Sequence, residues 1–100
     1  MTKLPIPFTE DFANSVYDVL VNVCGAAETM RSSFVHEYTS NHPSTEWRFQ
    51  GKMGFGGKFY LRYDRMTVNC YQEDLNDARE WMRSKANEDL AALVEDLVDA

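Results

Sequence analysis

The chain has 100 residues, of which 44% are hydrophobic and 26% are charged. This length and composition predict one domain spanning residues 1–100, because two half-length units would each bury too little apolar surface. No apolar run reaches the roughly 18 residues that a membrane span needs, and the first residues lack the apolar stretch of a signal peptide. We therefore expect a cytoplasmic protein without a membrane partner.

The net charge of −6 disfavours general binding to nucleic acid, because contacts with phosphates need a basic surface. The charge is unevenly spread along the chain. Residues 46–65 hold five basic side chains against two acidic ones, a net charge of +3, whereas residues 1–45 and 66–100 carry −3 and −6. The sequence thus predicts a basic middle segment between two acidic flanks.

Two helices are predicted in the first part of the chain. Thr9 is typical of an N-cap before a first helix over residues 10–24, and Gly25 is suited to the left-handed conformation that ends a helix. Apolar residues then recur at three- and four-residue steps, which predicts a second helix over residues 26–39. The apolar positions of this second helix are Ala27, Met30, Phe34, Val35 and Tyr38.

From Glu46 onward the apolar period falls from 3.6 to 2, which is typical of strands with one buried face. Alternation over residues 47–50, 58–63 and 66–71 predicts three strands. The short gap at Asp64 and Arg65 indicates a tight hairpin between the second and third strands. A three-stranded antiparallel meander is therefore expected.

A stripe of apolar residues at helical spacing runs from Leu75 to Leu97, and it predicts one long helix or two helices joined near Asn87. The expected fold class is α+β, with the order ααβββα and the sheet packed on helices that precede and follow it in sequence. Four large side chains are interpreted as core residues rather than as part of a cofactor site: Met30, Trp47, Trp81 and Met82.

The residues that could support catalysis or metal binding are few. Cys24 and Cys70 are interpreted as buried free thiols, because no secretory signal points to an oxidising compartment. His36 and His42 lack the spacing of zinc ligands. No nucleophile signature of a hydrolase or redox enzyme is present, so we expect no metal, no cofactor and no enzymatic activity.

Four of the five glycines lie between residues 51 and 57. The segment fails both the Walker pattern and the dinucleotide-binding pattern, because Phe59 stands where each requires another residue. One interpretation is a turn or bulge between the first two strands, with Met53 or Phe55 in the core. The alternative is a mobile tip that presents Phe55 to a partner, with Lys52 and Lys58 at its rim.

Three segments carry a resemblance to known proteins: Trp-Arg-Phe-Gln-Gly at 47–51, Gly-Phe-Gly-Gly-Lys-Phe at 54–59 and Val-Asn-Cys-Tyr-Gln-Glu-Asp at 68–74. Together they resemble short, mostly uncharacterised proteins of phages and other mobile elements. The resemblance implies no catalytic residues. It implies an inhibitor of host defence of the anti-CRISPR kind, acting in the cytoplasm of a bacterial host.

Two functions follow as hypotheses. The first is a non-enzymatic inhibitor that binds a host defence complex, one that handles nucleic acid, through the acidic last helix or the glycine-rich segment. The alternative is a nucleic-acid-binding module that uses basic and aromatic side chains on the strands, and self-association is compatible with either. Candidate partner contacts are Lys52, Phe55, Lys58, Arg62, Asp77, Glu80, Glu88 and Asp89, and the acidic set of the last helix also includes Asp74, Glu95, Asp96 and Asp99. The candidate nucleic-acid face comprises Arg48, Lys58, Tyr60 and Arg62.

Overall fold

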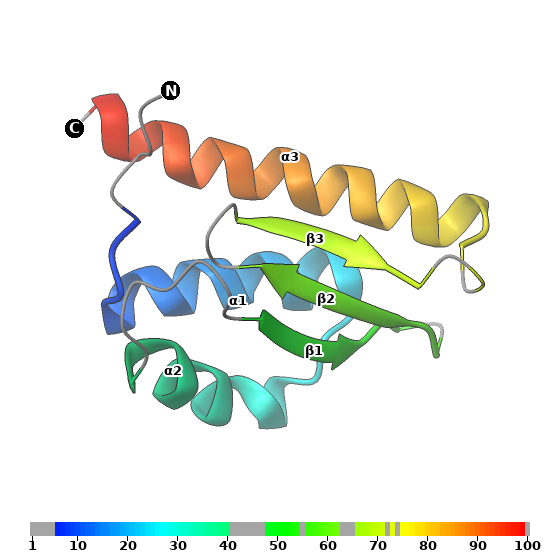
Figure 1. The fold of residues 1–100 in the computed structure, drawn as a ribbon, viewed down its shortest axis with the longest axis horizontal. Helices are drawn as coiled ribbons and strands as arrows, with labels where there is room; N and C mark the ends of the chain where they lie inside the picture. The colour runs from blue at the N-terminus through cyan, green and yellow to red at the C-terminus, as the bar shows by residue number, and fades with distance from the viewer. Residues whose placement is uncertain are drawn as a thin grey trace.

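The structure is a computed structural model that describes residues 6–40, 48–54, 56–62, 66–71, 73 and 75–99. For residues 97–99 it describes the backbone but not the side chains. Figure 1 shows two helical segments, a three-stranded sheet and a long final helix, which confirms the predicted α+β order ααβββα. The elements are α1 (Glu10–Cys24), the 3₁₀ turn η1 (Glu28–Met30), α2 (Arg31–Ser40), β1 (Arg48–Lys52), β2 (Lys58–Arg62), β3 (Thr67–Cys70) and α3 (Asp77–Asp99).

Helix α1 begins and ends where the sequence predicts. The Thr9 hydroxyl accepts a hydrogen bond from the backbone N–H of Phe12 at 3.3 Å. At the other end Gly25 has a φ of 71°, and its N–H donates to the Val21 carbonyl. The N–H of Ala26 donates to the Leu20 carbonyl at 3.0 Å, so the two bonds satisfy carbonyls that a helix end leaves open.

The second helix begins later than predicted. The expected start at residue 26 is wrong, because the Ala26 N–H is committed to the end of α1 and the Ala27 carbonyl accepts a 2.5 Å hydrogen bond from the Tyr17 hydroxyl. A 3₁₀ turn follows, and α2 begins only at Arg31. Met30, interpreted as a core residue, is 48% exposed, because it lies in this turn and not on the buried face of a helix.

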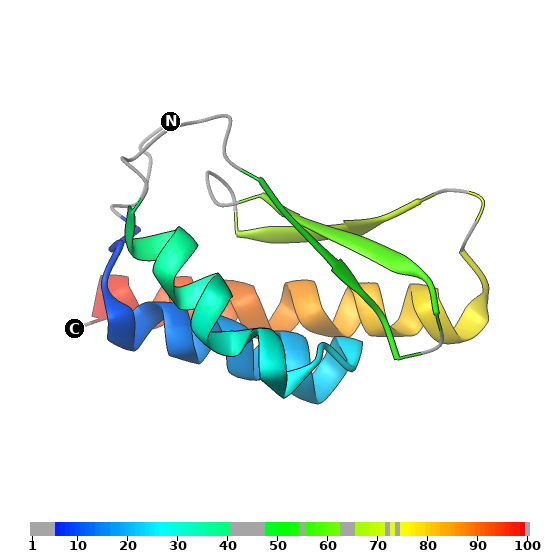
Figure 2. The ribbon, with the colours of Figure 1, turned by 90° about the horizontal axis from the view of Figure 1, so that it is seen from below.

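The three strands form one antiparallel sheet in the order β1-β2-β3. In each strand alternate residues are buried, and Figure 2 shows why: the helices lie on one side of the sheet. Among the described residues, no helix covers the opposite face. The predicted meander is confirmed, whereas Trp47, Tyr63 and the expected hairpin at Asp64 and Arg65 lie outside the described residues.

The glycine-rich segment joins β1 to β2 in a turn, as one of its two interpretations predicts. Gly56 N–H donates to the Met53 carbonyl at 2.9 Å, and Gly56 has a φ of 87°, which is typical of a three-residue hairpin loop. Met53 is buried, and Phe55 lies outside the described residues. The Gly54 N–H donates to the Cys24 carbonyl at 2.8 Å, so the turn is fastened to the end of α1.

Among the described residues, the buried side chains form one cluster between the sheet and the helices. Aromatic rings dominate the part beneath α2, whose buried residues are Phe34 and Tyr38. The Phe34 ring lies 4.9 Å from that of Phe49 and 5.0 Å from that of Tyr17. The fully buried side chains through which α2 packs on the core are thus two aromatic ones.

Helix α3 is one continuous helix that begins at Asp77, two residues after Leu75. Asn76 supplies the N-cap, because its side-chain oxygen accepts a hydrogen bond from the Arg79 N–H at 3.1 Å. Asn87 does not break the helix. Its side-chain amide accepts a hydrogen bond from the Val68 N–H at 2.6 Å and donates one to the Val68 carbonyl at 3.0 Å. The amide therefore takes the place of a neighbouring strand at the outer edge of β3.

Replacing Asn87 with alanine is expected to lower the free energy of unfolding by about 1–3 kcal/mol, because Val68 would keep an unsatisfied N–H and carbonyl. Urea unfolding monitored by circular dichroism measures the change. Ser84→Ala, at an exposed position of the same helix, is the matched control and should change stability little. An Asn87→Ala variant as stable as the Ser84→Ala variant would show that this edge of β3 needs no partner.

Candidate functional site

The face of the sheet that the helices leave uncovered is the candidate site, and we call it the open sheet face. It carries Arg48, Gln50 and Lys52 from β1, Lys58, Tyr60 and Arg62 from β2, Thr67 and Asn69 from β3, and Tyr71 directly after β3. All nine side chains are exposed or half-buried, whereas the strand residues between them, apart from the half-buried Gly51, are buried.

The register of the strands places the basic side chains beside one another. Arg48 pairs with Arg62, and Lys52 pairs with Lys58. Directly opposite residues of antiparallel strands have Cβ atoms about 4.5–5.5 Å apart, and like charges in such pairs destabilise the sheet. The Lys52–Lys58 pair thus concentrates positive charge at a cost in stability, and a bound anion would relieve it.

An aromatic pair lies within this basic surface. The rings of Tyr60 and Tyr71 meet edge to face with their centroids 5.0 Å apart. The Lys58 ammonium lies 5.6 Å from the centroid of the Tyr71 ring, close enough for a cation–π contact. The open sheet face therefore offers flat, partly exposed rings next to a cation.

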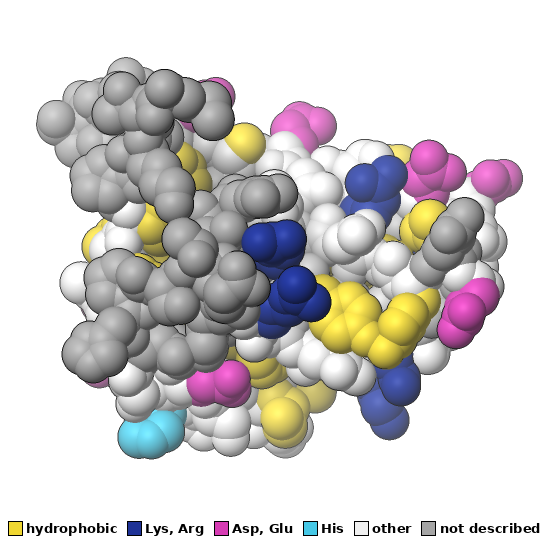
Figure 3. All heavy atoms as spheres, viewed as in Figure 1, with side chains coloured by type: hydrophobic (Ala, Val, Ile, Leu, Met, Phe, Trp, Pro, Cys, Tyr) yellow, Lys and Arg dark blue, Asp and Glu magenta, His cyan; other side chains and the backbone are white. Residues whose placement is uncertain are grey.

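The strands that form this face contain four basic residues and no acidic one. In Figure 3, which views this face, Lys and Arg side chains lie beside hydrophobic ones near the middle, and most Asp and Glu side chains lie toward the margin. The local charge is therefore opposite in sign to the net charge of the chain.

The sequence prediction for this face is confirmed in its geometry: Arg48, Lys58, Tyr60 and Arg62 share one face. Lys52, predicted as a rim residue of the glycine-rich segment, lies on the same face. Sequence reasoning did not include Tyr71 in the set. The sequence pattern that could have identified Tyr71 is the alternation of residues 68–71. Val68 and Cys70 are buried, so Tyr71 lies on the same side of the sheet as Asn69.

Helix α3 carries the acidic residues predicted as partner contacts. Asp77, Glu80 and Glu88 are exposed, whereas Asp89 is half-buried and forms an ion pair with Lys85 at 2.8 Å. The hydrogen bond from Lys85 to Asp89 raises the pKa of Lys85. Part of the acidic charge of α3 is therefore matched within the helix.

Trp81 on the same helix corrects a prediction. The sequence predicts a core residue at this position, but Trp81 is 64% exposed. Over residues 77–96, whose side chains the structure describes, the buried residues of α3 are Met82, Ala86 and Leu90, spaced four apart, so Trp81 lies out of phase with the buried stripe. The prediction of a buried Met82 is confirmed. The four-residue spacing of the buried positions already indicates that Trp81 is not a core residue. Trp47 lies outside the described residues.

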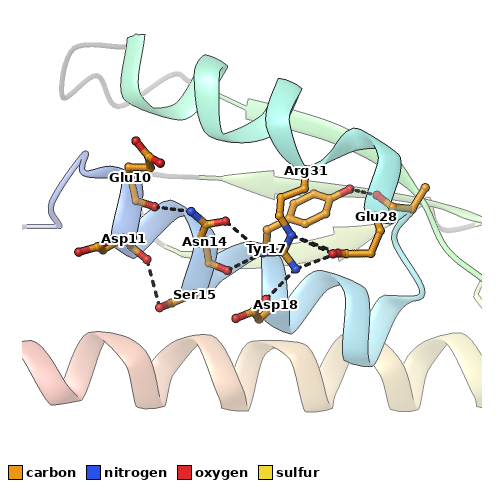
Figure 4. A network of polar contacts seen from close by, with 9 residues as sticks. Glu10, Asp11, Asn14, Ser15, Tyr17, Asp18, Glu28 and Arg31 are labelled. Atoms are coloured by element: carbon orange, nitrogen blue, oxygen red, sulfur yellow. Dashed lines mark hydrogen bonds and ion pairs between the residues drawn. The ribbon is translucent and has the colours of Figure 1, made fainter.

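Figure 4 shows a second concentration of polar groups, between α1 and the start of α2. The Arg31 guanidinium donates to Asp18 at 2.7 Å and to Glu28 at 2.9 Å, and it lies 5.2 Å from the centroid of the Tyr17 ring. The hydrogen bonds to Glu28 and Asp18 raise the pKa of Arg31. Because these charges satisfy one another, we interpret the cluster as a clamp between helices.

Of the residues considered for catalysis, the structure describes Cys24, Cys70 and His36. Cys24 and Cys70 are both buried and not joined by a disulfide, as predicted. Burial raises the pKa of the Cys24 thiol to about 12, with a smaller contribution from Cys70, so the reactive thiolate is disfavoured. His36 is exposed on α2, and His42 lies outside the described residues.

In the part of the chain that the structure describes, no three His, Cys, Asp or Glu side chains gather in a group that could hold a metal ion. Among the same residues, no helix is both long and apolar enough to cross a membrane. Comparison of the chain with protein-family models, with curated proteins and with solved structures gives no match. We therefore infer the function from the geometry of the open sheet face and of α3.

Proposed function

We propose that this protein is a non-enzymatic binding module that holds single-stranded nucleic acid on its open sheet face. The observation that carries the proposal is the Tyr60–Tyr71 ring pair beside Lys58, on strands without an acidic side chain. Bases stack on exposed aromatic rings for about 1–3 kcal/mol each, and basic side chains beside the rings contact the phosphates.

The arrangement favours a single strand over a duplex. The bases of a duplex are already stacked on one another, so they are not available to the rings of Tyr60 and Tyr71. A single strand can place its bases on the rings and its backbone along the basic side chains of β1 and β2. The net charge of −6 opposes any approach of nucleic acid, and the local excess of basic side chains on the face is what offsets it.

Replacing Tyr71 with alanine is expected to weaken oligonucleotide binding about tenfold, because one stacking surface is removed. Fluorescence anisotropy with a labelled oligothymidylate of about 12 nucleotides measures the dissociation constant. Tyr71→Phe keeps a ring and should retain most of the affinity. Trp81→Ala removes an exposed aromatic side chain from α3 and is the matched control. Equal losses of affinity in Tyr71→Ala and Trp81→Ala, or no measurable binding by the parent chain, would contradict the proposal.

A second candidate function is the phage-type inhibitor of a host defence complex, and the exposed Trp81 specifically favours it. Tryptophan is enriched among residues that dominate protein–protein binding energy, and a Trp that is 64% exposed gains much by burial. Asp77 and Glu80 lie on the same helix, so the complementary partner surface is basic, as on a protein that binds nucleic acid.

Capture of partners from a bacterial lysate separates the two functions. If the inhibitor function holds, a protein complex is recovered in stoichiometric amount after nuclease treatment, and Trp81→Ala abolishes most of that recovery. Tyr71→Ala serves as the control and should leave it unchanged. Recovery that nuclease removes and that depends on Tyr71 would support the nucleic-acid function and contradict the inhibitor.

A further inference from the structure

The two edges of the sheet differ in how their backbone groups are satisfied. At the outer edge of β3 the side-chain amide of Asn87 bonds both backbone groups of Val68. Strand β1 forms a ladder only with β2 among the described residues. An edge strand with unpaired N–H and carbonyl groups is a template for pairing with another chain.

The alternation of hydrogen-bonded and non-bonded pairs in the hairpin shows which backbone N–H and carbonyl groups of β1 are available to another strand. The Met53 N–H donates to the Gly57 carbonyl at 2.6 Å, so this pair is hydrogen-bonded. Because hydrogen-bonded and non-bonded pairs alternate in antiparallel strands, the backbone groups of Arg48, Gln50 and Lys52 point away from β2. Their side chains lie on the open sheet face.

A groove of about 590 Å³ runs beside this edge. Its far wall is the end of α1 and the turn η1, including Ala26, Ala27 and the 48% exposed Met30. Its apolar base includes Phe49 and Phe59, both buried. The groove thus has a line of outward-pointing backbone groups on one side and exposed apolar surface on the other.

We propose that β1 accepts an extended segment of a partner protein as a fourth strand, in which acidic residues alternate with apolar ones. Successive side chains of a strand point to opposite faces, so one set of the added strand lies on the open sheet face and the other set lies in the groove. The first set meets Arg48 and Lys52 and is acidic by charge complementarity. The second set meets Met30 and the apolar base.

Charge also argues against a second copy of this chain as the occupant. Antiparallel pairing of β1 with itself over all five residues centres on Gln50 and places Arg48 opposite Lys52 of the other copy. Like charges directly opposite one another destabilise a strand pair. An acidic segment of a different protein removes that repulsion and also offsets the Lys52–Lys58 pair within the sheet.

The test uses a labelled, end-blocked peptide of about six residues, the usual length of a strand, in which Glu alternates with Val. The full chain should bind it, and the backbone amide signals of Arg48, Gln50 and Lys52 should shift and gain protection from hydrogen exchange. A peptide in which Lys replaces Glu should bind at least about tenfold more weakly. Equal binding of both peptides, or binding of neither, would overturn the proposal.

Backbone methylation of the peptide separates strand addition from ordinary apolar docking. Alternate N–H groups of an added strand face β1, so methylation of one alternate set should abolish binding, whereas methylation of the other set should be tolerated. Met30→Glu should weaken binding about tenfold or more without loss of the fold, because Met30 is already exposed. Equal effects of the two methylations would contradict strand addition.

Two further measurements test the proposal. The first asks whether β1 takes a partner segment or a second copy of this chain, and the second asks whether peptide binding is independent of the nucleic-acid function. Sedimentation of the chain without peptide should show a monomer, and a concentration-dependent dimer broken by Gln50→Pro would assign the edge to a second copy instead. Tyr71→Ala should leave peptide affinity unchanged, since Tyr71 follows β3 at the other side of the sheet. A loss of peptide binding in Tyr71→Ala would place the peptide on the face and not at the edge.

Discussion

Replacing Phe34 with alanine is expected to lower the free energy of unfolding by about 3–5 kcal/mol, since removal of a fully buried aromatic ring would leave a cavity. Phe34 lies where three other rings meet, those of Tyr17, Tyr38 and Phe49, with centroids 5.0, 5.7 and 4.9 Å away. Small domains are stable by only about 5–15 kcal/mol, so this decrease is a large share of the total.

The position of α2 makes this effect specific. The helix buries only Phe34 and Tyr38, and its remaining residues are exposed or half-buried. Urea unfolding monitored by circular dichroism measures the decrease in stability, and Val35→Ala, at a half-buried position of the same helix, is the control with a smaller expected effect. Hydrogen exchange of α2 amides should rise in Phe34→Ala before that of α1 amides. Equal stability of the two variants would show that α2 is held by other contacts.

The strands could be predicted because their pattern had one physical cause. Each strand has one face on the core and one face open, so apolar and polar residues alternate with period two. The same alternation assigns Arg48, Lys58 and Tyr60 to one side. The open sheet face was therefore visible in the sequence, although its Tyr60–Tyr71 contact depends on the pairing of β2 with β3.

The second helix shows where periodicity fails. Ala27 and Met30 continue the apolar spacing of Phe34 and Tyr38, yet both lie outside α2 and are exposed. Hydrogen bonds that end α1 and the bond from the Tyr17 hydroxyl to the Ala27 carbonyl hold this segment in another conformation. These hydrogen bonds cannot be read from the spacing of apolar residues. The exposed apolar surface that results at Met30 is the wall of the groove beside β1.

Net charge was the least informative sequence property for the site. The chain carries −6, but the strands hold only basic charged residues, and the predicted acidic contacts Asp77, Glu80 and Glu88 lie on α3. A ligand near the sheet responds to the nearest charges, because salt at physiological strength screens exposed charges beyond about 8 Å. The sum over the chain therefore has the wrong sign for the open sheet face.

Replacing Lys58 with glutamate is expected to weaken oligonucleotide binding about 100-fold at a salt concentration of about 0.1 M, where exposed charges act over about 10 Å. The change removes a cation from the hairpin end of the open sheet face and places a carboxylate beside the Tyr71 ring, where the Lys58 ammonium now lies 5.6 Å from the centroid. It also puts a like charge near the phosphates that the neighbouring basic side chains contact. The side chain of Lys58 is exposed, so the fold should be retained.

Salt dependence gives this prediction a second readout. Removing one cation that neutralises a phosphate of a single strand should reduce the slope of log affinity against log salt by about 0.7, so Lys58→Glu should flatten the slope by at least that amount. Lys85→Glu on α3 changes the net charge equally and is the control, expected to alter affinity little. Because it also breaks the ion pair with Asp89, its fold is checked by circular dichroism. Equal weakening in both variants would mean that binding follows the net charge of the chain. Weakening confined to Lys58→Glu would mean that the nucleic acid lies on the sheet, because only there does the reversed charge face the phosphates.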